Sequence, residues 1–200
     1  MVNDNSNGQY YYNRGIVKSR LDLVKEAIDD YSKAIELTSE QDHLYQARFN
    51  KGICLRRLGP DYLDKSIEDL KKAAEMKNDR PSVHNNLGLS YFEKGDFEEA
   101  LIHYGKAIQY EKSSVHYNNR GLANYHVNCL KEAKADFDRA IELDSNDHTI
   151  YFNRGNVYLN WEPQQEFDLA HRDYERAIEL APNNAKLWHA KGLAFQGQAE

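Results

Sequence analysis

The sequence predicts an all-α fold, a solenoid of about five helix-turn-helix repeats followed by a sixth helix of the first type. One observation is a set of glycines at intervals of 37, 36, 33, 34 and 37 residues, namely Gly15, Gly52, Gly88, Gly121, Gly155 and Gly192. The other is a stripe of small, large apolar and alanine residues that follows each of the first five glycines. Self-similarity at such a period indicates supersecondary units that stack on their neighbours.

The second helix of each unit, here called helix B, carries the stripe. Its three positions are spaced i, i+4 and i+7, which places them on one helix face. The five stripes are Ala27, Tyr31, Ala34; Ser66, Leu70, Ala73; Ala100, Tyr104, Ala107; Ala133, Phe137, Ala140; and Ala170, Tyr174, Ala177.

The first helix, helix A, carries the glycine. A glycine inside a helix costs about 1 kcal/mol relative to alanine, so its repetition indicates close packing against helix B. Between the two helices, Gly95 suits the left-handed conformation that ends a helix, and Asn128 takes that place in the fourth unit.

The repeats divide almost the whole chain. We expect a flexible N-terminus over residues 1–8 and one array over residues 9–200, with repeats at about 8–41, 45–80, 81–113, 114–147 and 148–184. Residues 185–200 contain one further helix A. Either this helix caps the array, or the sequence is a segment of a longer protein.

The combined pattern resembles the tetratricopeptide repeat family. The third unit supplies Leu87, Gly88, Tyr91, Ala100, Tyr104 and Ala107, and the fifth supplies Tyr151, Gly155, Tyr158, Ala170, Tyr174, Ala177 and Pro182. The resemblance implies a right-handed α–α superhelix that binds an extended peptide or partner segment in a concave groove lined by helices A, as an adaptor or scaffold. Binding through an edge or the convex face stays open.

Composition excludes several classes of protein. Acidic residues exceed basic ones by 32 to 26, giving a net charge of −6, which argues against a nucleic-acid surface. No apolar run approaches the roughly 18–20 residues of a membrane span, and the N-terminus lacks the layout of a signal peptide. We therefore expect a soluble, cytoplasmic protein. Cys54 and Cys129 are too few for a disulfide framework, and both are expected to be reduced.

Residues for catalysis or for a cofactor do not emerge. No glycine-rich phosphate loop is present, and acidic pairs form no constellation for acid–base chemistry. The histidines lack the spacing that a zinc site needs; they are His43, His84, His103, His116, His126, His148, His171 and His189. The sequence predicts no enzyme, no metal and no cofactor. The alternative is that it forms the targeting domain of a larger enzyme.

A co-chaperone is a third possibility, and the resemblance allows a test of it. Relatives that bind chaperone tails use a two-carboxylate clamp with a lysine three residues before the glycine and an asparagine just after it. The lysine positions hold Tyr12, Phe49, Asn85, Asn118, Phe152 and His189, and the asparagine occurs only as Asn156. A co-chaperone role is therefore disfavoured.

Asparagines two residues before five of the glycines form the candidate binding site. A rotation of about 200° separates them from the glycine, so they should face the groove. They are Asn13, Asn50, Asn86, Asn119 and Asn153, with Asn85, Asn118, Asn156, Gln9 and Gln46 extending the polar strip. An amide can bond both C=O and N–H of a passing backbone. The pattern resembles the asparagine ladders of O-linked N-acetylglucosamine transferase and importin alpha. The competing interpretation is that the asparagines bond neighbouring helices.

Charged residues also recur in register. In four units, a cation directly precedes the glycine of helix A and an aspartate directly precedes the large residue of helix B. The remaining unit has Leu87 in place of the cation and His103 in place of the aspartate. This co-occurrence predicts the pairs Arg14–Asp30, Lys51–Asp69, Arg120–Asp136 and Arg154–Asp173. Independent solvated charges are the alternative.

Overall fold

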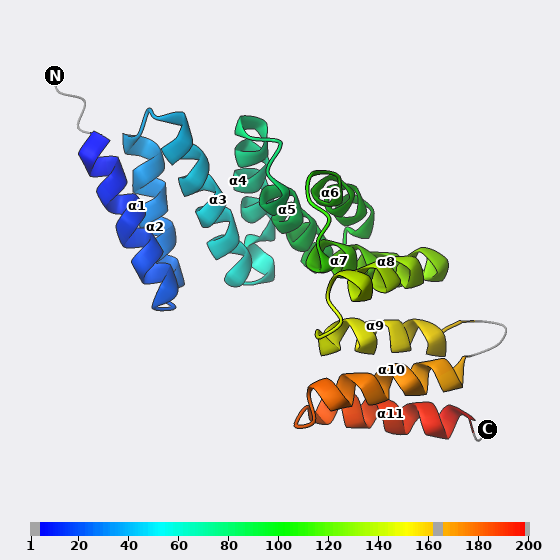
Figure 1. The fold of residues 1–200 in the computed structure, drawn as a ribbon. Coiled ribbons are helices and arrows are strands. Elements are labelled where there is room, and N and C mark those ends of the chain that lie inside the picture. Colours follow the sequence, from blue (N-terminus) through cyan, green and yellow to red (C-terminus); the bar gives the residue numbers. More distant parts are fainter. Residues whose placement is uncertain (1–4, 162–165, 199–200) are drawn as a thin grey trace. The chain divides into compact units, whose positions relative to one another are not determined.

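The computed structural model describes residues 5–161 and 166–198, and every regular element in these ranges is a helix (Figure 1). The elements are α1 (Asn5–Arg20), α2 (Val24–Leu37), α3 (Gln41–Arg57), the 3-10 helix η1 (Pro60–Tyr62), α4 (Leu63–Met76), α5 (Pro81–Lys94), α6 (Phe97–Tyr110), α7 (Ser114–His126), α8 (Leu130–Leu143), α9 (His148–Leu159), α10 (Phe167–Leu180) and α11 (Ala185–Gln198). The predicted all-α fold is confirmed. None of the described helices is both long enough and apolar enough to cross a membrane.

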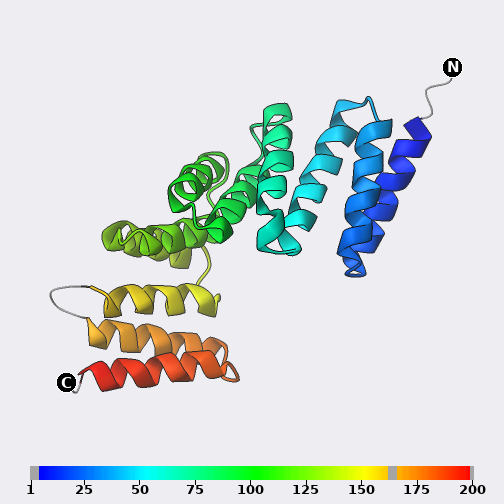
Figure 2. The same cartoon turned by 180° about the vertical axis from the view of Figure 1, so that it is seen from behind.

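The helices group into two compact units, Met1–Tyr110 and Glu111–Glu200, where the sequence predicts one array. The first unit contains the hairpins α1–α2, α3–α4 and α5–α6. The second contains α7–α8, α9–α10 and then α11, which packs on α10; α9, α10 and α11 lie side by side (Figures 1 and 2). Helix α1 already begins at Asn5, within the predicted flexible N-terminus, and residues 1–4 lie outside the described ranges.

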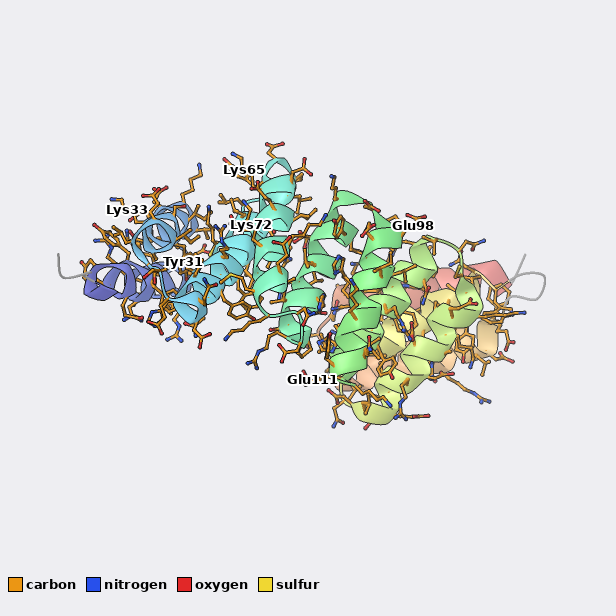
Figure 3. The ribbon with its side chains drawn as sticks, turned by 90° about the horizontal axis from the view of Figure 1, so that it is seen from above. Tyr31, Lys33, Lys65, Lys72, Glu98 and Glu111 are labelled. Atoms are coloured by element: carbon orange, nitrogen blue, oxygen red, sulfur yellow. The ribbon has the colours of Figure 1, made fainter. Side chains whose placement is uncertain are left out.

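Glycine in helix A makes room for the large residue of helix B. A Cβ atom added to Gly15 would lie 2.8 Å from the ring of Tyr31 (Figure 3), and one added to Gly88 would lie 2.5 Å from Tyr104. The same close approach occurs at Gly52 with Leu70, Gly121 with Phe137 and Gly155 with Tyr174. The prediction that these glycines serve packing is confirmed.

The stripe on helix B is the core of each hairpin. Tyr104 is 1% exposed, Phe137 and Tyr174 are 0% exposed, and the stripe's small residues are fully buried or nearly so. Burying one such large side chain contributes about 1.5–3 kcal/mol to the stability of its hairpin.

Turns between the helices follow their sequence signals. Gly95 (φ 86°) and Asn128 (φ 59°) both adopt the left-handed conformation, as predicted. Between α3 and α4, Pro60 begins a single 3-10 turn, η1. Residues 162–165, between α9 and α10, lie outside the described ranges.

All four predicted ion pairs form between helix A and helix B of one hairpin. The shortest N–O distances are 2.6 Å for Arg14–Asp30, 3.1 Å for Lys51–Asp69, 2.6 Å for Arg120–Asp136 and 2.7 Å for Arg154–Asp173. The four aspartates are buried, whereas the cations are partly exposed. The arginine beside Asp30 lowers the pKa of that carboxyl, against the effect of its burial.

Candidate interaction surface

The five asparagines that stand two residues before a repeat glycine, here called the register asparagines, lie about 200° around helix A from that glycine, which contacts helix B. Asn13 is exposed, and the other four are partly exposed. Their side chains are therefore not part of the hairpin core. Because the two units are separate bodies, the asparagines form one strip on α1, α3 and α5 and another on α7 and α9.

In the first unit, neighbouring polar groups hold these amides. Gln9 donates a hydrogen bond to the Asn13 amide oxygen at 3.0 Å. Asn50 donates to the hydroxyl of Tyr12 on α1 at 3.2 Å, and Asn86 donates to the carbonyl of Ser82 at 2.9 Å. Gln46 is exposed. One donor of Asn50 and one of Asn86 are thus engaged within the protein, which fixes the direction of each amide.

In the second unit, Asn153 on α9 donates to the amide oxygen of Asn118 on α7 at 3.0 Å, which links successive helices A. Asn156 behaves differently, because its amide oxygen accepts a 2.7 Å hydrogen bond from Tyr174 of helix B. Asn85 and Asn119 are partly exposed. Asn156 is therefore tied to its own hairpin.

A shallow pocket adjoins Asn50 between α1 and α3. Its volume is about 280 Å³, and it is lined partly by Ile16 and Ile53, each of which directly follows a repeat glycine. The pocket is also lined by Ser19, Arg20, Tyr31 and Cys54, so its walls are mixed, with the Asn50 amide beside two aliphatic side chains.

A second, larger pocket lies between α2, α3 and α4, and its volume is about 600 Å³. Five of its lining residues are basic and three are acidic, in a chain whose net charge is −6. Lys65 and Lys72 of α4 belong to the basic set (Figure 3). None of the register asparagines lines this pocket, so it is distinct from the asparagine strip.

The sequence interpretation missed one buried polar pair, His84 of α5 and His103 of α6. Their Nδ1 atoms lie 3.4 Å apart, and the residues are 5% and 8% exposed. The signal was present in the register: His84 lies four residues before its glycine, as Arg48 does, and His103 takes the position of Asp69. Since Arg48 pairs with Asp69 at 2.9 Å, the same two positions meet in both hairpins.

Comparison with protein families agrees with the repeat pattern. One tetratricopeptide repeat model matches residues 81–114, and a second model with the same description matches residues 8–41 and 148–184. Together these segments cover just over half of the chain.

Curated relatives match only through part of their length. Serine/threonine-protein phosphatase 5 of Rattus norvegicus is 34% identical over 118 residues, which are 58% of this chain and 21% of that protein. Peptidyl-prolyl cis-trans isomerase FKBP4 of Mus musculus is 29% identical over 140 residues, covering 60% of this chain and 30% of that protein. Hsp70-Hsp90 organizing protein 3 of Arabidopsis thaliana is 25% identical over 215 residues, covering 90% and 38%. The chain thus spans well under half of these relatives.

Solved structures share the fold at low sequence identity. YrrB, described as a TPR protein with an unusual peptide-binding site, superposes with a TM-score of 0.73 at 20% identity, covering 91% of this chain and 90% of that one. TTC0263, a thermophilic TPR protein of Thermus thermophilus, gives a TM-score of 0.69 at 18% identity, covering 94% and 99%. These matches agree with the hairpins described above, in which a glycine of helix A contacts the large residue of helix B. The chain therefore belongs to the tetratricopeptide repeat family and is a protein-interaction module.

Proposed function

We propose that the chain acts as an adaptor that binds an extended segment of a partner protein along its helices A. The observation that supports this is the register of the asparagines. One amide recurs at the same position of α1, α3 and α5, and again of α7 and α9, on the side away from helix B. A single polar residue on a helix face carries little information, but a recurring one matches the periodic backbone of an extended chain.

Hydrogen bonds within the strip agree with the competing interpretation, that the asparagines bond neighbouring helices, and they are also compatible with peptide binding. The bonds Asn50–Tyr12 and Asn153–Asn118 join successive helices A and hold each amide in one orientation before a partner arrives. Each amide offers two donors and one acceptor, so one internal bond leaves further bonding capacity for a peptide backbone. Preorganisation of this kind lowers the entropy lost on binding.

The pocket beside Asn50 suggests a side-chain preference. A peptide whose backbone bonds to Asn50 would place a neighbouring side chain near Ile16 and Ile53. An aliphatic residue matches these two side chains. We therefore expect modest sequence selectivity, arising from such hollows rather than from the amides.

Substitution of the strip tests the proposal. Replacing Asn86, Asn119 and Asn153 together with alanine is expected to preserve the melting temperature and to weaken binding by about 1 kcal/mol or more per lost bond. The probe is a peptide selected on the wild-type chain from a random display library, and affinity is measured by calorimetry.

Asn183, which is exposed outside the strip, supplies the matched control as Asn183→Ala. The control should bind the peptide as the wild type does. Unchanged peptide affinity of the folded triple variant would make the proposal fail, and a lower melting temperature in the same variant would show that the asparagines are structural.

The partial match to Hsp70-Hsp90 organizing protein 3 and to FKBP4 favours a co-chaperone as the second candidate function. Its sequence requirement is not met, because a lysine three residues before the glycine is absent from every repeat. The one matching asparagine, Asn156, accepts a hydrogen bond from Tyr174. A targeting domain within a larger enzyme is compatible with the adaptor proposal, and in that case these residues would contribute binding and not catalysis.

The co-chaperone alternative leads to a direct test. A peptide that ends in acidic residues with a free carboxylate is expected not to bind measurably in calorimetry, because the clamp lysine three residues before the glycine is missing from every repeat. The same peptide with an amidated end is the control. Micromolar binding by the free acid that amidation abolishes would contradict this expectation and restore the co-chaperone.

A further inference from the structure

Helix α11 has the sequence features of a helix A. Trp188, Gly192 and Phe195 are spaced as Tyr151, Gly155 and Tyr158 are in α9. On its inner side, Leu187 and Ala194 are 2% and 3% exposed, so α11 is firmly seated in the second unit. Its glycine-bearing face therefore corresponds to the face that α9 uses to bind its own helix B.

That face is uncovered among the described residues. In α9, Tyr151 and Tyr158 are 8% and 7% exposed and belong to clusters with residues of α10 and α11, whereas Trp188 and Phe195 are each 53% exposed. The glycine gives the same contrast. A Cβ atom on Gly155 would lie 2.8 Å from Tyr174, but one on Gly192 would meet nothing within 4 Å.

The cation of α11 makes one of the two ion pairs that the corresponding cation of α9 makes. Arg154, the residue before Gly155, contacts Asp138 of the preceding α8 at 2.6 Å and Asp173 of its own α10 at 2.7 Å. Lys191, the residue before Gly192, contacts Glu175 of the preceding α10 at 3.1 Å. Glu175 occupies the register position of Asp138, directly after the large residue. Among the described residues, Lys191 has no acidic partner that corresponds to Asp173.

A capping role does not account for this surface. Terminal helices that cap a solenoid present a polar outer face to solvent. Helix α11 instead presents two large aromatic side chains on either side of a glycine notch. Exposed apolar surface of this kind marks an interaction site.

We propose that the outer face of α11 binds an amphipathic helix of a partner protein that imitates helix B. The pattern it requires is that of α10, with a small residue, an aspartate three residues later, a large apolar residue directly after it, and alanine three residues further on. The large side chain would fill the notch at Gly192, and the aspartate would pair with Lys191. A second copy of this chain is a poor source, because the matching residues of α10, Ala170 and Tyr174, are 0% exposed.

The test uses a fluorescent peptide with the sequence of residues 167–180, cross-linked on its outer face because a free helix of this length is marginal in water. Fluorescence anisotropy with the intact chain should show saturable binding at concentrations below about 1 mM. Gly192→Leu, which fills the notch, is expected to weaken binding about tenfold or more. A peptide carrying Tyr174→Ala should lose binding to the wild-type chain.

Gly105 of α6 provides the matched control, because a Cβ atom there also meets nothing within 4 Å. Gly105→Leu should leave both the fold and the affinity unchanged. Absence of saturable binding, or equal weakening by both glycine variants, would overturn the proposal. Sedimentation that shows a dimer abolished by Gly192→Leu would assign the face to a second copy and would also overturn it. The triple asparagine variant should still bind the peptide, which separates this site from the strip.

Discussion

Replacing Asp136 with alanine is expected to lower the free energy of unfolding by about 3–5 kcal/mol, measured by urea denaturation. Asp136 is 4% exposed, and its carboxylate accepts hydrogen bonds from both the Nε and Nη2 atoms of Arg120, at 2.9 and 2.6 Å. It also accepts one from the buried Asn124 at 2.9 Å. Removing the carboxylate leaves a partly buried cation and an amide without this partner.

Glu132 lies one turn earlier on the same helix and is exposed, so Glu132→Ala is the matched control. We expect its effect to stay within about 0.5 kcal/mol. Adding Arg120→Leu to Asp136→Ala should cost less than the sum of the two single changes, because the double variant leaves no unpaired charge. If Asp136→Ala behaves like the control, the recurring charges act as independent solvated groups.

The within-hairpin ion pairs were predictable because their evidence is internal to one repeat. Cation and aspartate occur together in four repeats, and the repeat with Leu87 lacks both. Additional partners were not predictable. Arg154 also reaches Asp138 on the preceding hairpin, a contact that depends on how one hairpin stacks on the next.

The asparagine strip illustrates the same limit. Helix periodicity places Asn50 and Asn153 away from helix B, and both are partly exposed. Their bonds to Tyr12 and Asn118 cross between successive helices A, so no single repeat carries the signal for them. Asn156 was grouped with the strip by composition alone. Its register position, directly after the glycine, brings it within reach of the Tyr174 hydroxyl.

The histidine pair was missed because the histidines were searched for metal-ligand spacing within one helix. His84 and His103 come from two helices, and their meeting follows from the hairpin register that also brings Arg48 to Asp69. In physical terms, a neutral hydrogen-bonded pair takes the place of an ion pair at the same two positions.

The protonation state of this pair follows from its partners. His84 Nε2 lies 2.7 Å from the Asn78 carbonyl oxygen, which only accepts, so this nitrogen carries the proton. The Nδ1 of neutral His84 is then an acceptor, and His103 Nδ1 donates to it across 3.4 Å. A further proton on His84 would set two N–H groups against each other. The rings also stack near Tyr91 and Tyr110, so a charge there would be poorly solvated.

Acidification should therefore destabilise the first unit. Burial lowers the pKa of His103 to about 4 and lowers the pKa of His84, and the cation of Lys106 acts in the same direction on both. Because these folded-state pKa values lie below the ordinary value of 6.5, the unfolded chain binds more protons between pH 6.5 and about 4. The stabilisation is present in full above that window and is lost as the pH falls through it.

Urea denaturation of the wild type should thus show a free energy of unfolding lower by about 2 kcal/mol at pH 4.5 than at pH 7. His103→Gln retains an N–H donor for His84 Nδ1 but does not titrate, so its stability should fall less steeply over the same range. His189 is exposed on α11, and His189→Gln should keep the wild-type slope. Parallel decline of the wild type and His103→Gln between pH 7 and pH 5 would mean that the buried histidine pair does not set the acid sensitivity over this range, because carboxylates with depressed pKa values, such as Asp30, lose their stabilisation only at lower pH.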